Sequence, residues 1–222
     1  MSSSAGINPS NDLNIYNGKL TVEVDGATSE NSSVYGIQTS VYNVHGGEVN
    51  VGTGDASAKS SRSISVSAAN FNNYSTQKQI YKSGNATGDS SVSYGMDINN
   101  KFNFERGEIE VIAGQTTSLG STYGIRANNI LIGNEQTYAP NLGTIDVTVA
   151  GSSSADSHGI HSFNNIYVYS GALNIESGDA STSSGSSYAI YSANDALFRT
   201  CDVNVKSGSG KKTYTMDEVF KK

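Results

Sequence analysis

The chain has 222 residues, of which 36% are hydrophobic and 15% are charged, and it contains 24 Gly, 2 Pro and no Trp. This length suits one domain, and the formal net charge of −6 argues against nucleic acid as a partner, because a polyanion is bound by a basic surface. No apolar run approaches the length of a membrane span, so we expect no membrane insertion, and the single Cys201 excludes an internal disulfide framework.

An apolar pattern recurs along the chain with a period of about 30 residues. The equivalent anchor residues are Ile7, Ile37, Val66, Met96, Ile125, Ile160 and Ile190. Around each anchor, apolar residues alternate with polar ones over three short runs, as in strands with one buried face. The pattern predicts an all-β fold, a right-handed parallel β-helix (solenoid) of about seven coils of ~30 residues with three short strands per coil.

An asparagine follows most anchors at the fourth position. The residues are Asn11, Val41, Asn70, Asn100, Asn129, Asn164 and Asn194. Asparagine tolerates the left-handed backbone region, so we predict a tight turn between two strands here. Stacked in successive coils, these amides could also hydrogen-bond one another.

The first three predicted coils begin near residues 5, 35 and 64. In the second coil, either Val41 or Tyr42 with Val44 points inward. The third coil carries Gln77, Lys78 and Gln79 where apolar residues belong. A bulge or an irregular loop is therefore expected in that coil.

The later coils include one insertion and a predicted cap. The fourth, 94–114, is regular, with Phe102, Phe104, Ile109 and Val111 inward. The fifth holds the extra residues 133–144, GNEQTYAPNLGT, which should project as a loop. Thr215 and Glu218 have the spacing of a capping box, so a short terminal helix laying Met216, Val219 and Phe220 over the last coil is expected. The predicted domains are 1–4, a disordered start or an expression remnant; 5–208, the β-helix; and 209–222, a C-terminal cap or tail.

A mostly aromatic column lies two residues before the anchors. It comprises Ala5, Tyr35, Ile64, Tyr94, Tyr123, His158 and Tyr188. Residues two apart on a strand share a face, so the column is predicted to point inward with the anchors. By the same rule His158 and His161, three apart, should lie on opposite faces. This favours a packed core histidine over a metal ligand, and we expect no metal and no cofactor.

The repeats resemble a known group of proteins. YGIRANNILI, HGIHSFNNIYVYSGALNIESG and YAIYSANDALF are similar to the coils of bacterial cell-surface parallel β-helix repeat proteins of the carbohydrate-binding type, which look like polysaccharide lyases without a lyase site. The resemblance covers 5–208. It implies an extracellular location on a bacterial cell surface, with this chain a fragment without its signal peptide. Some members look calcium-bound through clustered Asp, whereas the Asp residues here are scattered.

No catalytic site is expected. A lyase of this architecture needs a Lys or Arg base opposite grouped carboxylates. Outward acids do occur near one column, at Glu48, Glu108, Glu110, Asp146, Glu176 and Asp202. The arginines, however, fall at different phases of the repeat, which indicates a solvated wall.

Two tyrosines form the candidate binding site. Tyr167 and Tyr169 alternate with the inward Ile166 and Val168 and should point outward. Leu197 and Arg199 continue their column one coil later, and the loop carrying Tyr138 leaves the adjacent coil. Such a surface suits contact with a glycan or with another surface protein, unless the Tyr138 loop folds back over it.

These features predict a non-enzymatic extracellular module, glycan-binding or adhesive. Its partner would be a polysaccharide, a host or cell-wall glycan, or another surface protein. The alternatives are a structural spacer or stalk of a surface protein, and a divergent inactive polysaccharide-lyase-like domain.

Overall fold

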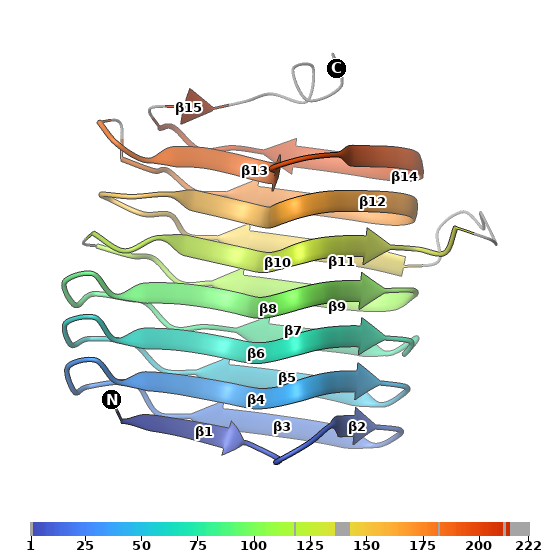
Figure 1. The fold of residues 1–222 in the computed structure, drawn as a ribbon, viewed down its shortest axis with the longest axis horizontal. Coiled ribbons are helices and arrows are strands. Elements are labelled where there is room, and N and C mark those ends of the chain that lie inside the picture. Colours follow the sequence, from blue (N-terminus) through green and yellow to red (C-terminus); the bar gives the residue numbers. More distant parts are fainter. Residues whose placement is uncertain (1, 118, 136–142, 182, 211, 214–222) are drawn as a thin grey trace.

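The computed structural model describes residues 2–117, 119–135, 143–181, 183–210 and 212–213. Within them the chain is an all-β parallel solenoid without a helix, and its strands form one sheet that wraps around the coil. The front strands run from left to right and the back strands return from right to left while the chain rises from its N-terminus (Figure 1). The coil is therefore right-handed.

Each coil has a long front strand and a shorter back strand. The front strands are β1 (Ser3–Ile7) with β2 (Leu13–Ile15), β4 (Ser33–Val44), β6 (Arg62–Asn73), β8 (Val92–Phe104) and β10 (Thr122–Ile132). The back strands are β3 (Lys19–Val24), β5 (Glu48–Thr53), β7 (Lys78–Lys82), β9 (Gly107–Ala113) and β11 (Gly143–Val149). In the sixth coil β12 (Ser157–Ser177) covers both walls, and β13 (Ser186–Ser192), β14 (Ala196–Lys206) and β15 (Lys212–Thr213) complete the stack.

The first two predicted strands of most coils thus run together as one. The asparagine that was expected to form a turn lies instead within this strand, where the pairing register shifts at Asn70 and Asn129. Between the paired positions one strand has one residue more than its neighbour, as β8 has between Ile98 and Lys101. This residue forms a β-bulge, so the front strand continues without a break.

The anchor column is confirmed in register. The pairs are Ile7–Ile37, Ile37–Val66, Val66–Met96, Met96–Ile125, Ile125–Ile160 and Ile160–Ile190. The five middle anchors are at most 1% exposed. In the second coil Tyr42 and Val44 are the inward residues, both fully buried, and the four inward residues predicted for the fourth coil are buried as well.

The irregularity predicted in the third coil is wrong. β7 pairs with β5 and β9 without a register shift, and Gln79 takes an inward position in which it is fully buried. Its Nε2 donates hydrogen bonds to the main-chain oxygens of Gly47 (2.9 Å) and Gln77 (3.0 Å). These bonds offset the desolvation of the amide nitrogen, whereas the buried Oε1 of Gln79 has no hydrogen-bond partner among the described residues.

The predicted inward orientation of the aromatic column is also wrong, and a column of glycines explains why. In five of the coils the residue before the anchor is a glycine: Gly6, Gly36, Gly95, Gly124 and Gly159. A Cβ on any of these five would lie 2.2–2.4 Å from a side-chain carbon of the back wall, for example Cγ1 of Val147 at Gly124. The glycines therefore face inward where the two walls touch, and the preceding residues must face outward.

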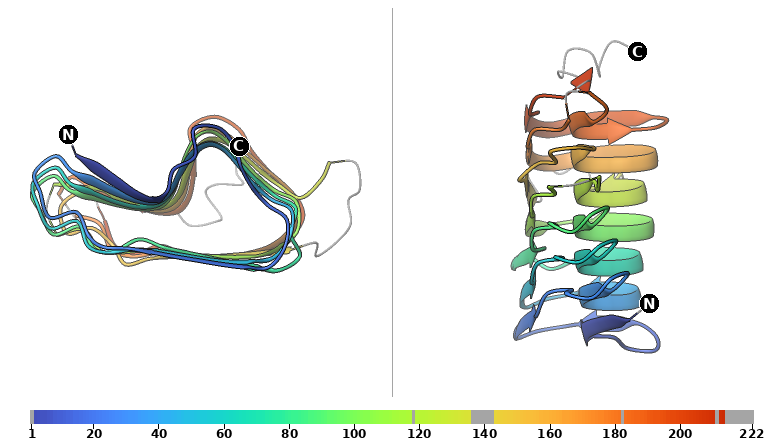
Figure 2. Two further views of the ribbon diagram at one scale, coloured as in Figure 1. Left: turned by 90° about the horizontal axis from the view of Figure 1, so that it is seen from below. Right: turned by 90° about the vertical axis from the view of Figure 1, so that its left-hand side faces the viewer.

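The wall bends at these glycines. The pairing skips them: Tyr123 pairs with His158 and Ile125 with Ile160. As a result, the strict alternation of faces is broken between the glycine and the anchor, and both point inward. Seen along the coil axis, the front wall is indented, so the solenoid has a concave outer face (Figure 2).

Side chains also bond coil to coil and brace the corners within a coil. On the front wall Asn43 donates to Asn14 (2.8 Å) and Asn72 donates to Asn43 (2.9 Å), while Asn100 donates to Asn70 (2.9 Å). A ladder of amides therefore forms, mainly in a column other than the predicted one.

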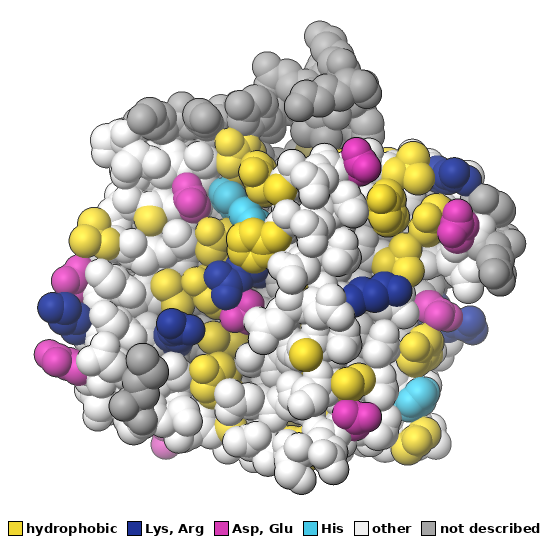
Figure 3. Space-filling view, in the orientation of Figure 1, with side chains coloured by type: hydrophobic (Ala, Val, Ile, Leu, Met, Phe, Trp, Pro, Cys, Tyr) yellow, Lys and Arg dark blue, Asp and Glu magenta, His cyan; other side chains and the backbone are white. Residues whose placement is uncertain are grey.

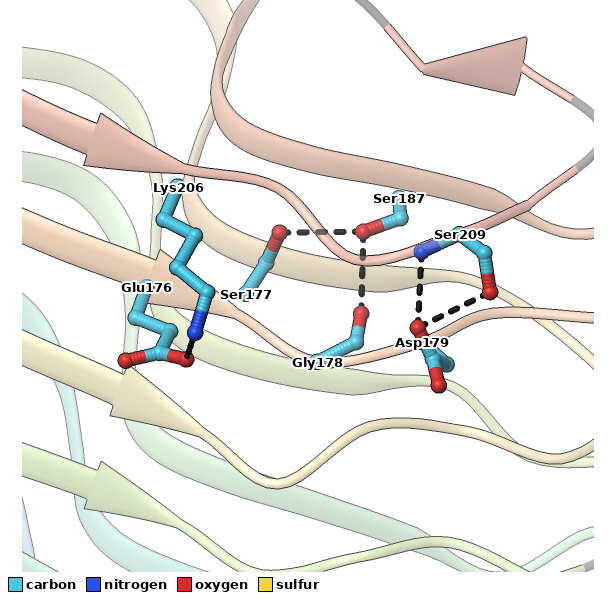
Figure 4. Close-up of polar contacts among 7 residues, drawn as sticks. All are labelled: Glu176, Ser177, Gly178, Asp179, Ser187, Lys206 and Ser209. Carbon is cyan, nitrogen blue, oxygen red and sulfur yellow. Dashed lines mark hydrogen bonds and ion pairs between the residues drawn. The ribbon is translucent and has the colours of Figure 1, made fainter.

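Near the C-terminal end, Ser187 bridges Ser177 and the Gly178 oxygen, and Asp179 accepts from Ser209 of the next coil (Figure 4). The Ser187 bridge recurs at Ser63 and Ser93, so buried hydroxyls brace the same corner of several coils.

Two predictions concern parts of the chain that lie outside the described residues. They are the Tyr138 loop and the terminal helix with Met216, Val219 and Phe220. At the other end, β1 begins at Ser3, which pairs with Ser33, two residues before the predicted start of the first coil.

Candidate functional site: a concave aromatic face

Aromatic and polar side chains from four successive coils meet in the indentation of the front wall. We call them the concave aromatic face. Its members are Tyr94 and Asp97 on β8, Tyr123 and Arg126 on β10, His158, His161 and Phe163 on β12, and Tyr188 and Tyr191 on β13. In the view of Figure 3, hydrophobic and histidine side chains gather in the upper part of this wall, next to basic and acidic ones.

The bend at the glycines brings two columns together. One column is the aromatic one, two residues before the anchor, and the other lies one residue after it. The strand changes direction between the two columns. Side chains from both columns therefore converge on the outer side of the wall, opposite the inward-facing anchor. Neither Tyr94, His158 nor Tyr188 belongs to the core inside the coil, although each is at most 8% exposed. They form a second, outer packing layer.

The rings are in continuous contact along the coil axis. Tyr94 packs edge-on against Tyr123 (5.3 Å between centroids), Tyr123 against His158 (5.2 Å), and His158 against Tyr188 (4.9 Å). In the neighbouring column His161 stacks on Tyr191 (4.7 Å). Edge-to-face and offset contacts of this kind stabilise aromatic clusters beyond their area of burial.

Arg126 holds the centre of the face. Its Nε and Nη2 donate to the two carboxylate oxygens of Asp97, each at 2.9 Å. Its guanidinium carbon lies 4.3 Å from the Tyr94 ring centroid and 5.9 Å from that of Phe163. The bidentate pair cancels the charge of Arg126 and fixes its plane, so the face carries planar hydrogen-bonding groups without strong net charge.

His158 and His161 lie on the same face, contrary to the prediction. The break in alternation after His158 places the rings side by side, with 2.6 Å between their Nδ1 atoms. Burial lowers the pKa of His158 to about 4 and, together with the positive field of His158 and Arg126, that of His161 to about 3. Both rings are therefore neutral at pH 7.

The predicted site residues form a separate group on the same wall. Ile166 and Val168 are buried in the core, and Tyr167 and Tyr169 alternate with them as predicted. Leu197 pairs with Tyr167 in register, and the guanidinium of Arg199 lies 5.6 Å from the Tyr169 centroid. Tyr169 is 7% exposed and Tyr167 is half-buried, whereas Tyr138 lies outside the described residues.

Four of the six outward acids of the back wall are paired with lysines. The described ion pairs are Lys19–Glu48, Lys78–Glu108, Lys78–Glu110 and Lys206–Glu176. Hydrogen bonds to Glu108 and Glu110 raise the pKa of Lys78 above its ordinary value, which keeps the amine protonated. A shallow hollow of about 330 Å³ lies over Asp146, Asn174 and Asn204, whose side chains bond one another. Among the described residues, no three His, Cys, Asp or Glu side chains are grouped as a metal site.

Sequence reasoning missed the concave aromatic face as a surface. The signal was present in the dipeptides Tyr94-Gly95, Tyr123-Gly124 and His158-Gly159. A glycine repeated at one phase of a β-helix indicates close approach of two walls, and its aromatic neighbour must then point outward.

Comparison with known proteins adds no relative. No family model, no curated protein and no solved structure matches this chain. Within its described part, the chain contains no helix of the length and apolar character that a membrane span requires.

Proposed function

We propose that the chain is a non-enzymatic, extracellular module of a bacterial cell-surface protein that binds glycans through its concave aromatic face. The observation that carries the proposal is the run of aromatic rings along the coil axis, interleaved with the Arg126–Asp97 pair. Rings offer flat apolar surfaces to the C–H faces of sugars, and fixed planar polar groups bond their hydroxyls.

The shape of the face fits an extended chain better than a compact ligand. Successive coils are about 4.8 Å apart, so equivalent groups repeat along the axis at roughly that interval. The backbone of the front wall is indented along the coil axis (Figure 2), and the side chains of the concave aromatic face lie over this indentation. Phe163, which is 47% exposed, and the half-buried Tyr123 and Tyr191 supply its accessible rings. A single site of this kind is weak, with a Kd of about 0.1–1 mM, and gains strength through multivalent display.

A glycan array followed by calorimetric titration of the best oligosaccharide tests the proposal. We expect Phe163→Ala to weaken binding with little change in melting temperature, since the ring is half exposed. Tyr16→Ala is a matched control, because Tyr16 is a 63% exposed ring on a different part of the solenoid. Binding that is unchanged in Phe163→Ala would contradict this face as the site.

The group formed by Tyr167, Tyr169, Leu197 and Arg199 is the second candidate face. If it binds the glycan instead, Tyr167→Ala and Tyr169→Ala lose binding while Phe163→Ala keeps it. Unchanged binding with a large fall in melting temperature would assign the two tyrosines to packing.

A structural spacer is the alternative function, favoured by the unbroken register of the anchors from Ile7 to Ile190. Absence of binding to every glycan on the array would support it. A divergent inactive lyase-like domain is less well supported, because Lys78 is held protonated between two carboxylates and so cannot act as a base. Incubation with polygalacturonate or alginate should yield no unsaturated product, with or without Ca²⁺.

A further inference from the structure

The two ends of the solenoid expose the edges of strands. Among the described residues, β2 pairs only with β4 and β3 only with β5 at one end, and β14 pairs only with β12 at the other. An open strand edge is a template for pairing with another chain. Beside these edges, inward apolar residues of a kind that is fully buried in the middle coils are only half-buried. They are Leu13, Ile15 and Leu20 in the first coil, and Phe198, Val203 and Val205 in the last.

The pairing register predicts how one end fits the other. Followed from coil to coil along the back wall, the column of Leu20 ends at Val203. The column of Val22 ends at Val205 in the same way. A second copy that continues the stack beyond β14 therefore sets apolar residues on apolar ones. The front wall adds Leu13 on Ala196 and Ile15 on Phe198.

The outward residues of the two ends are complementary in charge. In the same register Lys19 lies over Asp202, and Glu23 lies over Lys206, so opposite charges meet at two positions. Between them Thr21 lies over Asn204, whose amide donates to Asn174 (2.9 Å) in its own chain. The polar ladder of the back wall thus continues from one copy into the next.

A cation–π contact completes the fit at the corner after the front wall. Tyr16 is 63% exposed and stacks on His45 of the next coil at 4.8 Å, so the other face of its ring points away from the stack. Tyr16 follows Ile15 and Arg199 follows Phe198, so the register brings this ring over Arg199. The guanidinium already lies 5.6 Å from the Tyr169 centroid and would then lie between two rings, which is a favourable position.

We propose that copies of this chain stack end to end, with β2 and β3 of one copy pairing in parallel with β14 of another. The described coils nearly superpose when they are viewed along the axis (Figure 2), so a copy that points in the same direction continues both walls. A reversed copy would not match the indented front wall. Because each joint uses two different ends, the assembly is an open fibre rather than a closed dimer.

The short strand β15 limits the joint at one place. It pairs with Ser186 and Ser187, which are the positions that Ser3 and Ser4 of the incoming copy would take. Only one of the two segments can pair there, so the joint depends on β2 and β3 rather than on the start of β1. Residues 214–222 are too short a segment to pair along a whole coil of about 30 residues.

Sedimentation velocity of the full chain between about 5 μM and 500 μM tests the proposal. We expect the average mass to rise with concentration and to pass that of two copies without a plateau. Glu23→Lys sets two lysines against each other at the joint, and Lys206→Glu sets two glutamates, so each should weaken association at least about tenfold. Glu135→Lys and Lys59→Glu are matched controls, since they make the same charge changes at exposed positions away from both ends and should associate as the parent does.

Mixing Glu23→Lys with Lys206→Glu gives the sharpest result. Every joint between the two variants again brings one lysine and one glutamate together, so the mixture should recover the association that each variant lacks alone. A parent that stays monomeric at about 500 μM, a plateau at two copies, unchanged association of Lys206→Glu, or a mixture that stays monomeric would each overturn the proposal. The measurement uses no glycan, so its result is independent of the proposed function.

Discussion

At the scale of single residues, His158 and His161 make stability depend on pH. Their pKa values in the folded protein, about 4 and about 3, lie below the ordinary value of 6.5. The unfolded chain therefore takes up protons below pH 6.5 while the folded chain does not. The stability is present in full above pH 6.5 and falls on acidification until the folded pKa values are reached, by up to about 1.4 kcal/mol per pH unit for each histidine.

Urea unfolding at pH 7.5, 6 and 5 measures this dependence. Carboxylates contribute little above pH 5, so the comparison isolates the histidines. The double variant His158→Phe/His161→Phe should lose much less stability between pH 7.5 and 5 than the parent. Equal slopes in the parent and the double variant would show that the histidines are not buried in a neutral state.

A second residue-scale prediction concerns the glycines at the bend. Gly124→Ala should destabilise the protein by about 1–3 kcal/mol, because its Cβ would lie 2.2 Å from Cγ1 of Val147 and the walls would have to separate. The seventh coil carries Ala189 at this phase, so Ala189→Gly is a suitable control and should change stability by less. The free energy of unfolding, measured in urea, compares the two variants. If Gly124→Ala leaves this free energy unchanged, the walls are not in close contact.

At the scale of elements, β7 shows how a polar residue can occupy a column of apolar ones. Gln79→Leu should cost about 1–3 kcal/mol despite its greater hydrophobicity, because the main-chain oxygens of Gly47 and Gln77 lose their donor in a partly buried place. Gln77→Leu, at an exposed position two residues away, should stay within about 0.5 kcal/mol of the parent. A stabilised Gln79→Leu variant in thermal unfolding would contradict this reading of β7.

The elements also show what the sequence could predict. The period placed every anchor in its correct coil, because apolar residues that stack from coil to coil must recur at a fixed interval. The orientation of Tyr94, Tyr123 and His158 could not be predicted from alternation, which assumes a straight strand. Only the contact of Gly124 with the opposite wall fixes the bend, and that contact joins residues from two walls. The concave aromatic face was missed for this reason. On the straight stretch that follows, Tyr167 and Tyr169 do alternate with the buried Ile166 and Val168, although Tyr169 is itself only 7% exposed.

At the scale of the whole molecule, stability should depend on the position of a coil in the stack. Ile125 is fully buried between two neighbouring coils, and Ile7 in the first coil is half-buried. Ile125→Ala should therefore cost about 2–5 kcal/mol and Ile7→Ala markedly less. Chemical denaturation monitored by circular dichroism compares them, and equal costs would indicate that the first coil is packed as tightly as the centre.

The 35-residue step between Ile125 and Ile160 has a consequence for engineering. The extra residues fall between Ile132 at the end of β10 and Gly143 at the start of β11, yet Ile145 still pairs with Ile109 below and with Leu173 above. The chain has thus tolerated a change of length at this corner with no change in the register of its neighbours. The corresponding corners of other coils, such as that between Phe104 and Gly107, are accordingly suited to grafted peptides, and a reporter tag inserted there should leave the solenoid folded.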